Sequence, residues 1–236
     1  TTSIGLTPIF MAAQKGHLDV VRFLVSEAQA DVNKATTDNG STPIYIAAEQ
    51  GHLEVVRFLA SEAQADVNKA RTDTGVTPVW VAAEQGHLDV VRFLASEAQA
   101  DVNKAAVGGH TPLMIAAFRG QLQTVRFLIP SGSTNLHLTT PDGRNAISGA
   151  CMGKHIELCG RLLVAGLAIT IPQDCQHSLT FTTQVLDWVA ERLACRHRFM
   201  TVVLFGMHEN GGTALSMLGG VLEVRVRIAE FLDIQT

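Results

Sequence analysis

The 236-residue chain is poor in tyrosine, tryptophan and cysteine. It contains one tyrosine and two tryptophans, and its four cysteines all lie after residue 150. Their spacing shows no paired framework, which argues against a small disulfide-stabilised domain and favours a reducing compartment. We therefore expect an intracellular protein, and the cytoplasm is the favoured compartment.

An excess of charge of one sign is also lacking. The net charge is −4, and counting along the chain gives 11 basic and 14 acidic residues up to residue 150, then 7 and 8. Nucleic acid or an anionic membrane would select a basic face, so neither is expected as the main partner. The longest apolar run, Leu162 to Ile171, is about half of what a membrane-spanning helix needs, so no span is predicted. The start has no initiator methionine and no secretory signal, so we expect an internal or processed piece. Residues 1–5 (TTSIG) resemble residues 36–40 (TTDNG), the middle of a repeating unit, so we also expect a repeat before Thr1.

Internal repetition is what the sequence has in abundance. Residues 47–70, AAEQGHLEVVRFLASEAQADVNKA, return at 82–105 with one change, from Glu54 to Asp89. Threonine-proline pairs begin at 7, 42, 77 and 111, so the successive periods are 35, 35 and 34 residues. A fixed period in this range indicates stacked repeats, which offer a long surface and seldom an enclosed pocket. The first expectation is therefore binding rather than catalysis.

Each repeat is predicted to hold two helices and a hairpin-like finger. Thr42 precedes a proline and is expected to cap the first helix, because its hydroxyl can accept from an orphan amide. Gly51 is expected to end that helix, since glycine enters the left-handed region without steric cost. Helical spacing predicts a second helix from about Leu53 to Glu62, with Phe58 on its outer side. The polar residues 69–76 then predict the finger.

The segment TPIYIAAEQGHLEVVRFL, followed by ADVN, resembles the ankyrin repeat, whose pattern has Thr-Pro-Leu-His, Ala-Ala, Gly-His-Leu and Ala-Asp-Val-Asn at these places. The resemblance is strongest over residues 5–103 and stays good through Leu128. It implies an all-α solenoid of stacked antiparallel helix pairs, with fingers projecting at right angles. It also implies a concave face made by the fingers and the first helices.

The array is expected to cover residues 1–169, with about four clear repeats and a degenerate fifth. The repeats carry about two extra residues, which the register SEAQADVN places where the second helix meets the finger. Pro130 predicts an early end to the second helix of the fourth repeat. In the fifth repeat, Gly153 and Lys154 invert the usual glycine position. Residues 170–236 are predicted to form a helical C-terminal extension, or alternatively a degenerate pair of capping repeats.

The candidate partner-binding residues are those that are bulky or that vary between nearly identical repeats. The place of the ankyrin histidine holds a large apolar residue in four repeats: Phe10, Tyr45, Trp80 and Met114. These residues are expected either to fill gaps between repeats or to anchor a partner. Further candidates at the ends of the first helices and in the fingers are Gln14, Lys15, Glu49, Gln50, Glu84, Gln85, Phe118, Arg119, Arg71, Val76 and His110. Neutral drift on a solvated surface is the alternative for each of them.

Other polar residues are given structural roles. The histidines of the Gly-His pairs (His17, His52 and His87) are expected to belong to turns. Three asparagines match one that ankyrin repeats sometimes have hydroxylated, and a hydrogen bond at the finger base is the favoured role (Asn33, Asn68 and Asn103). One group of residues is of the types that zinc accepts as ligands: Cys151, His155, Cys159, Cys175, His177, Cys195 and His197. Its first two cysteines replace core Ala and Val, and no C-x-x-C is present, so no metal or cofactor is predicted.

We predict a non-catalytic protein-protein interaction module or scaffold that binds one or more partner proteins through its concave face. No G-x-S-x-G, P-loop or dinucleotide-binding motif is present, so the chain is not expected to be an enzyme. Two alternatives remain open. In the first alternative, the chain is a structural subunit embedded permanently in a larger assembly. In the second, it is the targeting arm of an enzyme whose catalytic domain lies outside these residues.

Overall fold

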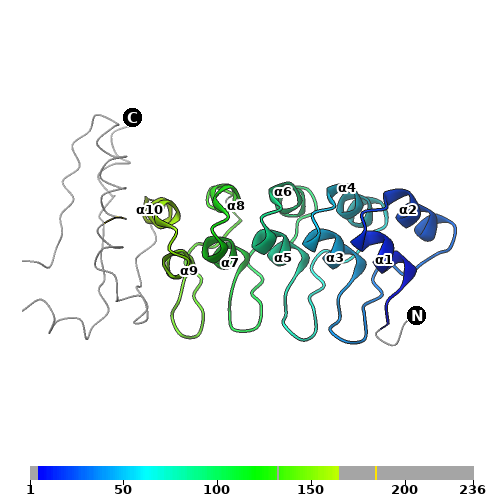
Figure 1. The fold of residues 1–236 in the computed structure, drawn as a ribbon, viewed down its shortest axis with the longest axis horizontal. Coiled ribbons are helices and arrows are strands. Elements are labelled where there is room, and N and C mark those ends of the chain that lie inside the picture. The colour runs from blue at the N-terminus through cyan, green and yellow to red at the C-terminus, as the bar shows by residue number, and fades with distance from the viewer. Residues whose placement is uncertain (1–4, 132, 165–183, 185–236) are drawn as a thin grey trace, which may run out of the picture.

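Antiparallel helix pairs stack side by side, and a finger precedes each pair after the first (Figure 1). The computed structural model describes residues 5–131, 133–164 and 184. The first helices form one row: α1 (Pro8–Gln14), α3 (Pro43–Glu49), α5 (Pro78–Gln85), α7 (Pro112–Arg119) and α9 (Ala146–Met152). The second helices form a parallel row: α2 (Leu18–Ser26), α4 (Leu53–Arg57), α6 (Leu88–Ser96), α8 (Leu122–Leu128) and α10 (Ile156–Val164).

Each first helix packs against the next first helix, and the fingers project beyond this row. The predicted all-α solenoid is confirmed for the described residues. The core is a continuous apolar layer between the two rows of helices, with residues such as Ile44, Val79 and Leu113 almost completely buried. The expectations for the C-terminal extension lie outside the described residues.

The starts and ends of the helices follow the predicted residues. The Thr42 hydroxyl accepts a hydrogen bond from the Tyr45 amide at 3.3 Å, and the threonines that precede α1, α5 and α7 do the same. Gly51 lies in the left-handed region with φ of 75°. In the fifth repeat Lys154 takes the left-handed conformation, with φ of 60°, whereas Gly153 is right-handed. The inverted glycine of that repeat is therefore confirmed.

The second helix of the second repeat differs from its predicted form. It is not one α-helix: α4 ends at Arg57 and continues as a π-helix, η1 (Phe58–Glu62). Gln64 then takes the left-handed conformation with φ of 56°, and the Ala65 amide bonds to the Leu59 carbonyl at 2.8 Å. The widened turn lies where the extra residues of the repeat are predicted. In the fourth repeat, α8 ends at Leu128, two residues short of the length of α6, as Pro130 predicts.

The prediction that Phe58 lies on the outer side of its helix is wrong, because its side chain is only 8% exposed. The guanidinium of Arg22, from the preceding repeat, covers the ring at 4.9 Å from its centroid. Arg57 covers Phe93 in the same way at 4.6 Å. Phe23 of the first repeat has no such cover among the described residues and is 60% exposed. Helical spacing missed this burial because the covering residue belongs to another repeat.

Hydrogen bonds to the backbone tie successive repeats together. His52 Nε2 donates to the Gln14 carbonyl at 3.1 Å, and His87 Nε2 donates to the Glu49 carbonyl at 3.0 Å. At the finger bases, the Asn33 side chain accepts from the Asp66 amide at 2.8 Å, and the asparagines at 68 and 103 repeat this contact. The structural roles predicted for His52, His87 and the three asparagines are therefore confirmed.

Candidate protein-binding groove

Main-chain hydrogen bonds join three successive fingers, at residues 36–41, 71–76 and 106–110, into a wall along one side of the array. Within a finger, the Arg71 amide donates to the Val76 carbonyl at 2.9 Å, which closes the hairpin. Between fingers, the Thr72 amide donates to the Asn39 carbonyl at 2.9 Å, and the Val107 amide donates to the Thr74 carbonyl at 2.8 Å. Because these bonds use main-chain groups, the wall is held in place without depending on side-chain identity.

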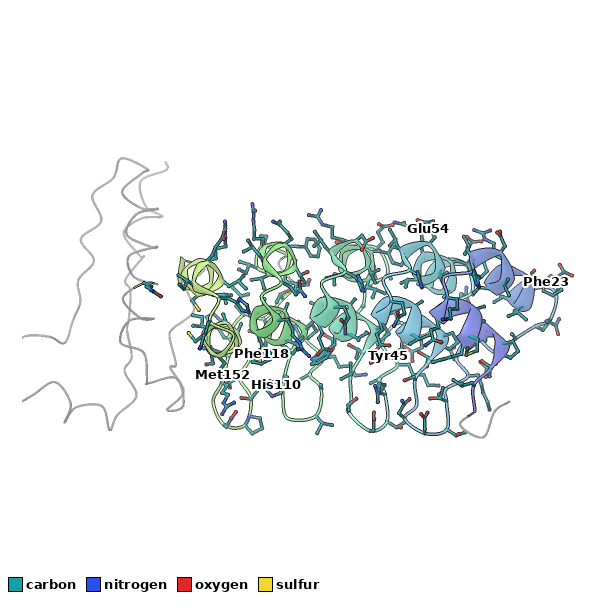
Figure 2. The ribbon with its side chains drawn as sticks, viewed as in Figure 1. Phe23, Tyr45, Glu54, His110, Phe118 and Met152 are labelled. Atoms are coloured by element: carbon teal, nitrogen blue, oxygen red, sulfur yellow. The ribbon has the colours of Figure 1, made fainter. Side chains whose placement is uncertain are left out.

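A groove of about 570 Å³ lies between this wall and three first helices, α5, α7 and α9. We call it the finger groove. Its lining is mostly apolar and spans three repeats: Asp73, Thr74, Val76, Trp80, Ala106, Val107, His110, Met114, Ile115, Phe118, Arg144, Asn145, Gly149 and Met152. Figure 2 labels His110, Phe118 and Met152 at this groove, and Phe23 at the opposite end of the array. Its size lies within the range of pockets that accept small molecules or a few side chains.

Trp80 joins the floor of the groove to its wall. The side chain is buried to 9% exposure, and its Nε1 donates to the His110 carbonyl in the next finger at 2.8 Å. Tyr45 occupies the same position one repeat earlier, and Arg71 of the next finger lies over its ring at 5.7 Å. Trp80 and Tyr45 therefore each contact the finger that follows them.

All four members of this aromatic and methionine series are buried in the described chain: Phe10, Tyr45, Trp80 and Met114. They fill the space between repeats, which is one of the two predicted roles. Trp80 and Met114 also line the finger groove. Contact with a partner stays a prediction for them.

Two exposed apolar side chains stand at the finger groove. Val107, in a finger, is 72% exposed, and Phe118, at the end of α7, is 39% exposed. Leaving apolar surface in water is unfavourable, and covering it stabilises a complex by about 25 cal/mol per Å² before the costs of association. These two side chains are therefore the most accessible apolar contacts that the groove offers.

The charged groups around the groove are paired. Arg71 bonds to Asp73 at 2.6 Å, and this hydrogen bond holds the pKa of the Asp73 carboxyl below its ordinary value. Arg144 pairs with a neighbouring carboxylate, Asp142, at 2.8 Å. Arg119 reaches back to Glu84 at 2.6 Å and so joins α7 to α5. The groove is thus apolar at its centre and balanced in charge at its edge.

A glycine sets how closely α9 approaches α7. A β-carbon at Gly149 would lie 2.9 Å from the Met114 carbonyl oxygen, so the two helices pack with no room for a side chain there. The corresponding residues of earlier repeats are larger: Ile46, Val81 and Ile115. The fifth repeat therefore packs more tightly at this point than the repeats before it.

The structure brings some of the predicted site residues together and leaves others apart. Five of them line the finger groove: Val76, Trp80, His110, Met114 and Phe118. The other ten lie outside its lining, at the ends of first helices or beside earlier fingers: Phe10, Gln14, Lys15, Tyr45, Glu49, Gln50, Arg71, Glu84, Gln85 and Arg119. Val76 is buried, although a variable finger position suggests exposure, because its side chain is part of the apolar core as well as of the groove lining.

Sequence reasoning missed all four lining residues of the fifth repeat: Arg144, Asn145, Gly149 and Met152. The repeat alignment contained the signal for Arg144 and Met152. Arg144 occupies the place of Val76 and His110, directly before the helix cap, and Met152 occupies the place of Glu84 and Phe118. The fifth repeat was aligned with the others, and comparing its variable positions with theirs would have found both.

The cysteine and histidine cluster considered for zinc lies only partly within the residues that the structure describes. Cys151 and Cys159 lie close together, but within residues 5–131, 133–164 and 184 no three side chains of the metal-binding types gather into a site. Four members of the cluster lie outside the described residues: Cys175, His177, Cys195 and His197. No helix in the described part of the chain combines the length and apolarity needed to cross a membrane.

The comparison with protein families agrees with this architecture. A family model described as ankyrin repeats, in three copies, matches residues 1–71 and 63–137. Together these matches cover more than half of the chain. No curated protein matches it.

Proposed function

The chain belongs to the ankyrin-repeat family, whose repeats are in general protein-protein interaction modules, and from that premise we propose that it binds a partner protein through the finger groove. The occupant is an apolar segment of the partner, in contact with Val107 and Phe118. The observation that carries this proposal is the groove itself, an apolar hollow that spans three repeats and keeps two apolar side chains exposed.

The rigidity of the groove supports binding as its function. The three fingers at 36–41, 71–76 and 106–110 are bonded to one another through main-chain groups, and Trp80 fixes one of them to α5. A preformed surface loses little conformational entropy when a partner binds, so a larger share of the contact energy appears as affinity. Aromatic side chains at the centre of an interface contribute most of that energy, which makes Phe118 the expected anchor.

We further infer that the array binds without catalysing a reaction. The ankyrin fold is typically non-catalytic. The carboxylates beside the groove accept hydrogen bonds from arginines, as Asp73 does from Arg71. These carboxylates are therefore ionised and already bonded to arginines, whereas a general base must accept a proton directly from the substrate.

The test is affinity capture of cell proteins with three forms of the chain, compared by quantitative mass spectrometry. The double variant Val107→Glu and Phe118→Glu places two charges in the groove at exposed positions, so the fold is expected to persist. The control is Phe23→Glu, which makes the same kind of change at an exposed phenylalanine far from the groove (Figure 2).

We expect a set of proteins that is captured by the wild type and by the Phe23 variant and lost with the double variant. Circular dichroism and urea unfolding of all three forms establish that the loss does not come from unfolding. Capture of the same proteins in the same amounts by the folded double variant would contradict the proposal.

A further inference from the structure

The two helices of the fifth repeat bring two cysteines into contact. Cys151 lies in α9, Cys159 lies in α10, and their Sγ atoms are 3.5 Å apart. Both are thiols in the structure. Every other repeat has alanine and valine at these two positions, as at Ala83 and Val91, and buries both completely. The fifth repeat therefore replaces an apolar contact between its helices with a pair of sulfur atoms.

The two thiols differ in access to solvent. Cys159 is 1% exposed, whereas Cys151 is only partly buried. The hydrogen bond with Cys159 lowers the pKa of the Cys151 thiol, which raises its thiolate fraction near neutral pH. The thiolate is the form that attacks a disulfide. Access and ionisation thus both select Cys151 to react first.

We propose that Cys151 and Cys159 form a reversible disulfide, with Cys151 as the attacking sulfur and Cys159 as the resolving sulfur, and with a low-molecular-weight disulfide such as oxidised glutathione as the oxidant. In the first step, the Cys151 thiolate attacks one sulfur of oxidised glutathione. A mixed disulfide forms on Cys151, the sulfur-sulfur bond of the oxidant breaks, and one glutathione thiolate leaves.

In the second step, Cys159 loses its proton to solvent and attacks the Cys151 sulfur. The protein disulfide forms, the mixed disulfide breaks, and the second glutathione thiolate leaves and takes up a proton. In total the protein loses two protons and two electrons, which together make two hydrogen atoms, and the oxidant gains both. Reduced glutathione reverses both steps.

The geometry suits this reaction. A disulfide requires a sulfur-sulfur distance of about 2.05 Å, so the two atoms need to approach by roughly 1.5 Å. Side-chain rotation on two adjoining helices supplies most of such a movement. The bond would fix α10 to α9, which lines the finger groove through Met152. The fifth repeat would then hold a covalent link between its helices.

The experiment treats the reduced full chain with oxidised glutathione and follows the intact mass. The double variant Cys175→Ser and Cys195→Ser serves as the background, so that only the two thiols in question react. We expect this protein to lose the mass of two hydrogen atoms. Adding Cys159→Val should instead trap one glutathione on Cys151, and adding Cys151→Ala should leave the protein unmodified. Both added substitutions restore the residue that other repeats carry, so the packing is expected to survive.

Peptide mapping of the oxidised wild-type chain provides a second measurement in case the serine background does not fold. It should recover a peptide that links Cys151 to Cys159. A background protein that keeps both thiols, or that holds a stable glutathione on Cys151 with Cys159 present, would overturn the proposal. So would a wild-type map in which these cysteines pair only with other residues.

Discussion

Replacing Trp80 tests whether the series of buried side chains braces the fingers. The change Trp80→Phe removes the Nε1 donor and part of the ring, while leaving an aromatic group at a position where the first repeat already packs Phe10. A lost neutral hydrogen bond costs about 0.5–1.5 kcal/mol. The His110 carbonyl also accepts from the Ala106 amide at 3.0 Å, so it keeps one partner when the indole is removed, which favours the lower half of that range.

The smaller ring adds a packing cost, and we expect Trp80→Phe to lower the free energy of unfolding by about 1–2 kcal/mol in total. Trp80→Ala also leaves a cavity between α5 and the next finger, and it should cost about 3–5 kcal/mol. Tyr45→Phe is the matched control, because it removes a polar group from the equivalent position and leaves the ring in place under Arg71. It should cost less than Trp80→Phe.

The assay is urea unfolding followed by far-ultraviolet circular dichroism, together with hydrogen exchange of the finger amides 106–110. Those amides should exchange faster in Trp80→Phe than in wild type, while the amides of α1 and α2 should not change, since repeats contact only their neighbours. An unchanged exchange rate in this finger would refute the bracing role. A cost for Trp80→Ala no greater than that for Trp80→Phe would refute the packing argument.

Three further predictions concern local contacts. Arg57→Lys keeps the charge but loses the planar guanidinium over the Phe93 ring, so the free energy of unfolding measured in urea should fall by about 0.5–1 kcal/mol. An unchanged free energy of unfolding would show that this contact does not stabilise the fold. Gln64 has a left-handed backbone that costs a residue other than glycine about 1–2 kcal/mol, and Gln64→Gly removes this strain while adding chain entropy to the unfolded state. The free energy of unfolding should therefore rise by about 0.5–1 kcal/mol in the same assay, and a fall would contradict the strain. The lowered pKa of Asp73 gives stability that is present above its unfolded value near 3.8 and is lost as the pH falls through the lower folded value. In Arg71→Ala, the pKa of Asp73 measured by nuclear magnetic resonance should rise toward its ordinary value, and an unmoved pKa would exclude the ion pair as the main cause.

Much of the fold was predictable because its signals are local and repeated. Thr42 caps a helix through an amide three residues away, and Gly51 ends that helix through its own backbone conformation. Both effects act within a few residues, so the sequence shows them directly. The burial of Phe58 was not predictable in this way, because the covering Arg22 lies in the preceding repeat and approaches only after the helix pairs stack.

The candidate site shows the same division. Variation among repeats correctly drew attention to His110 and Phe118, which line the finger groove. The same criterion selected Arg71 and Arg119, which form ion pairs with carboxylates and lie outside the lining. Variation marks a position that differs between repeats, but it does not say which neighbouring helix or finger that position faces.

The sequence by itself determined the repeat length, the residues that start and end most helices, and the family of the chain, since each depends on short-range backbone chemistry or on a recurring pattern. Only the tertiary structure decided where a groove opens, that Val107 and Phe118 stay exposed beside it, and that two sulfur atoms meet between α9 and α10. These features depend on distances between elements. Such distances are set when the side chains of neighbouring helices and repeats pack against one another.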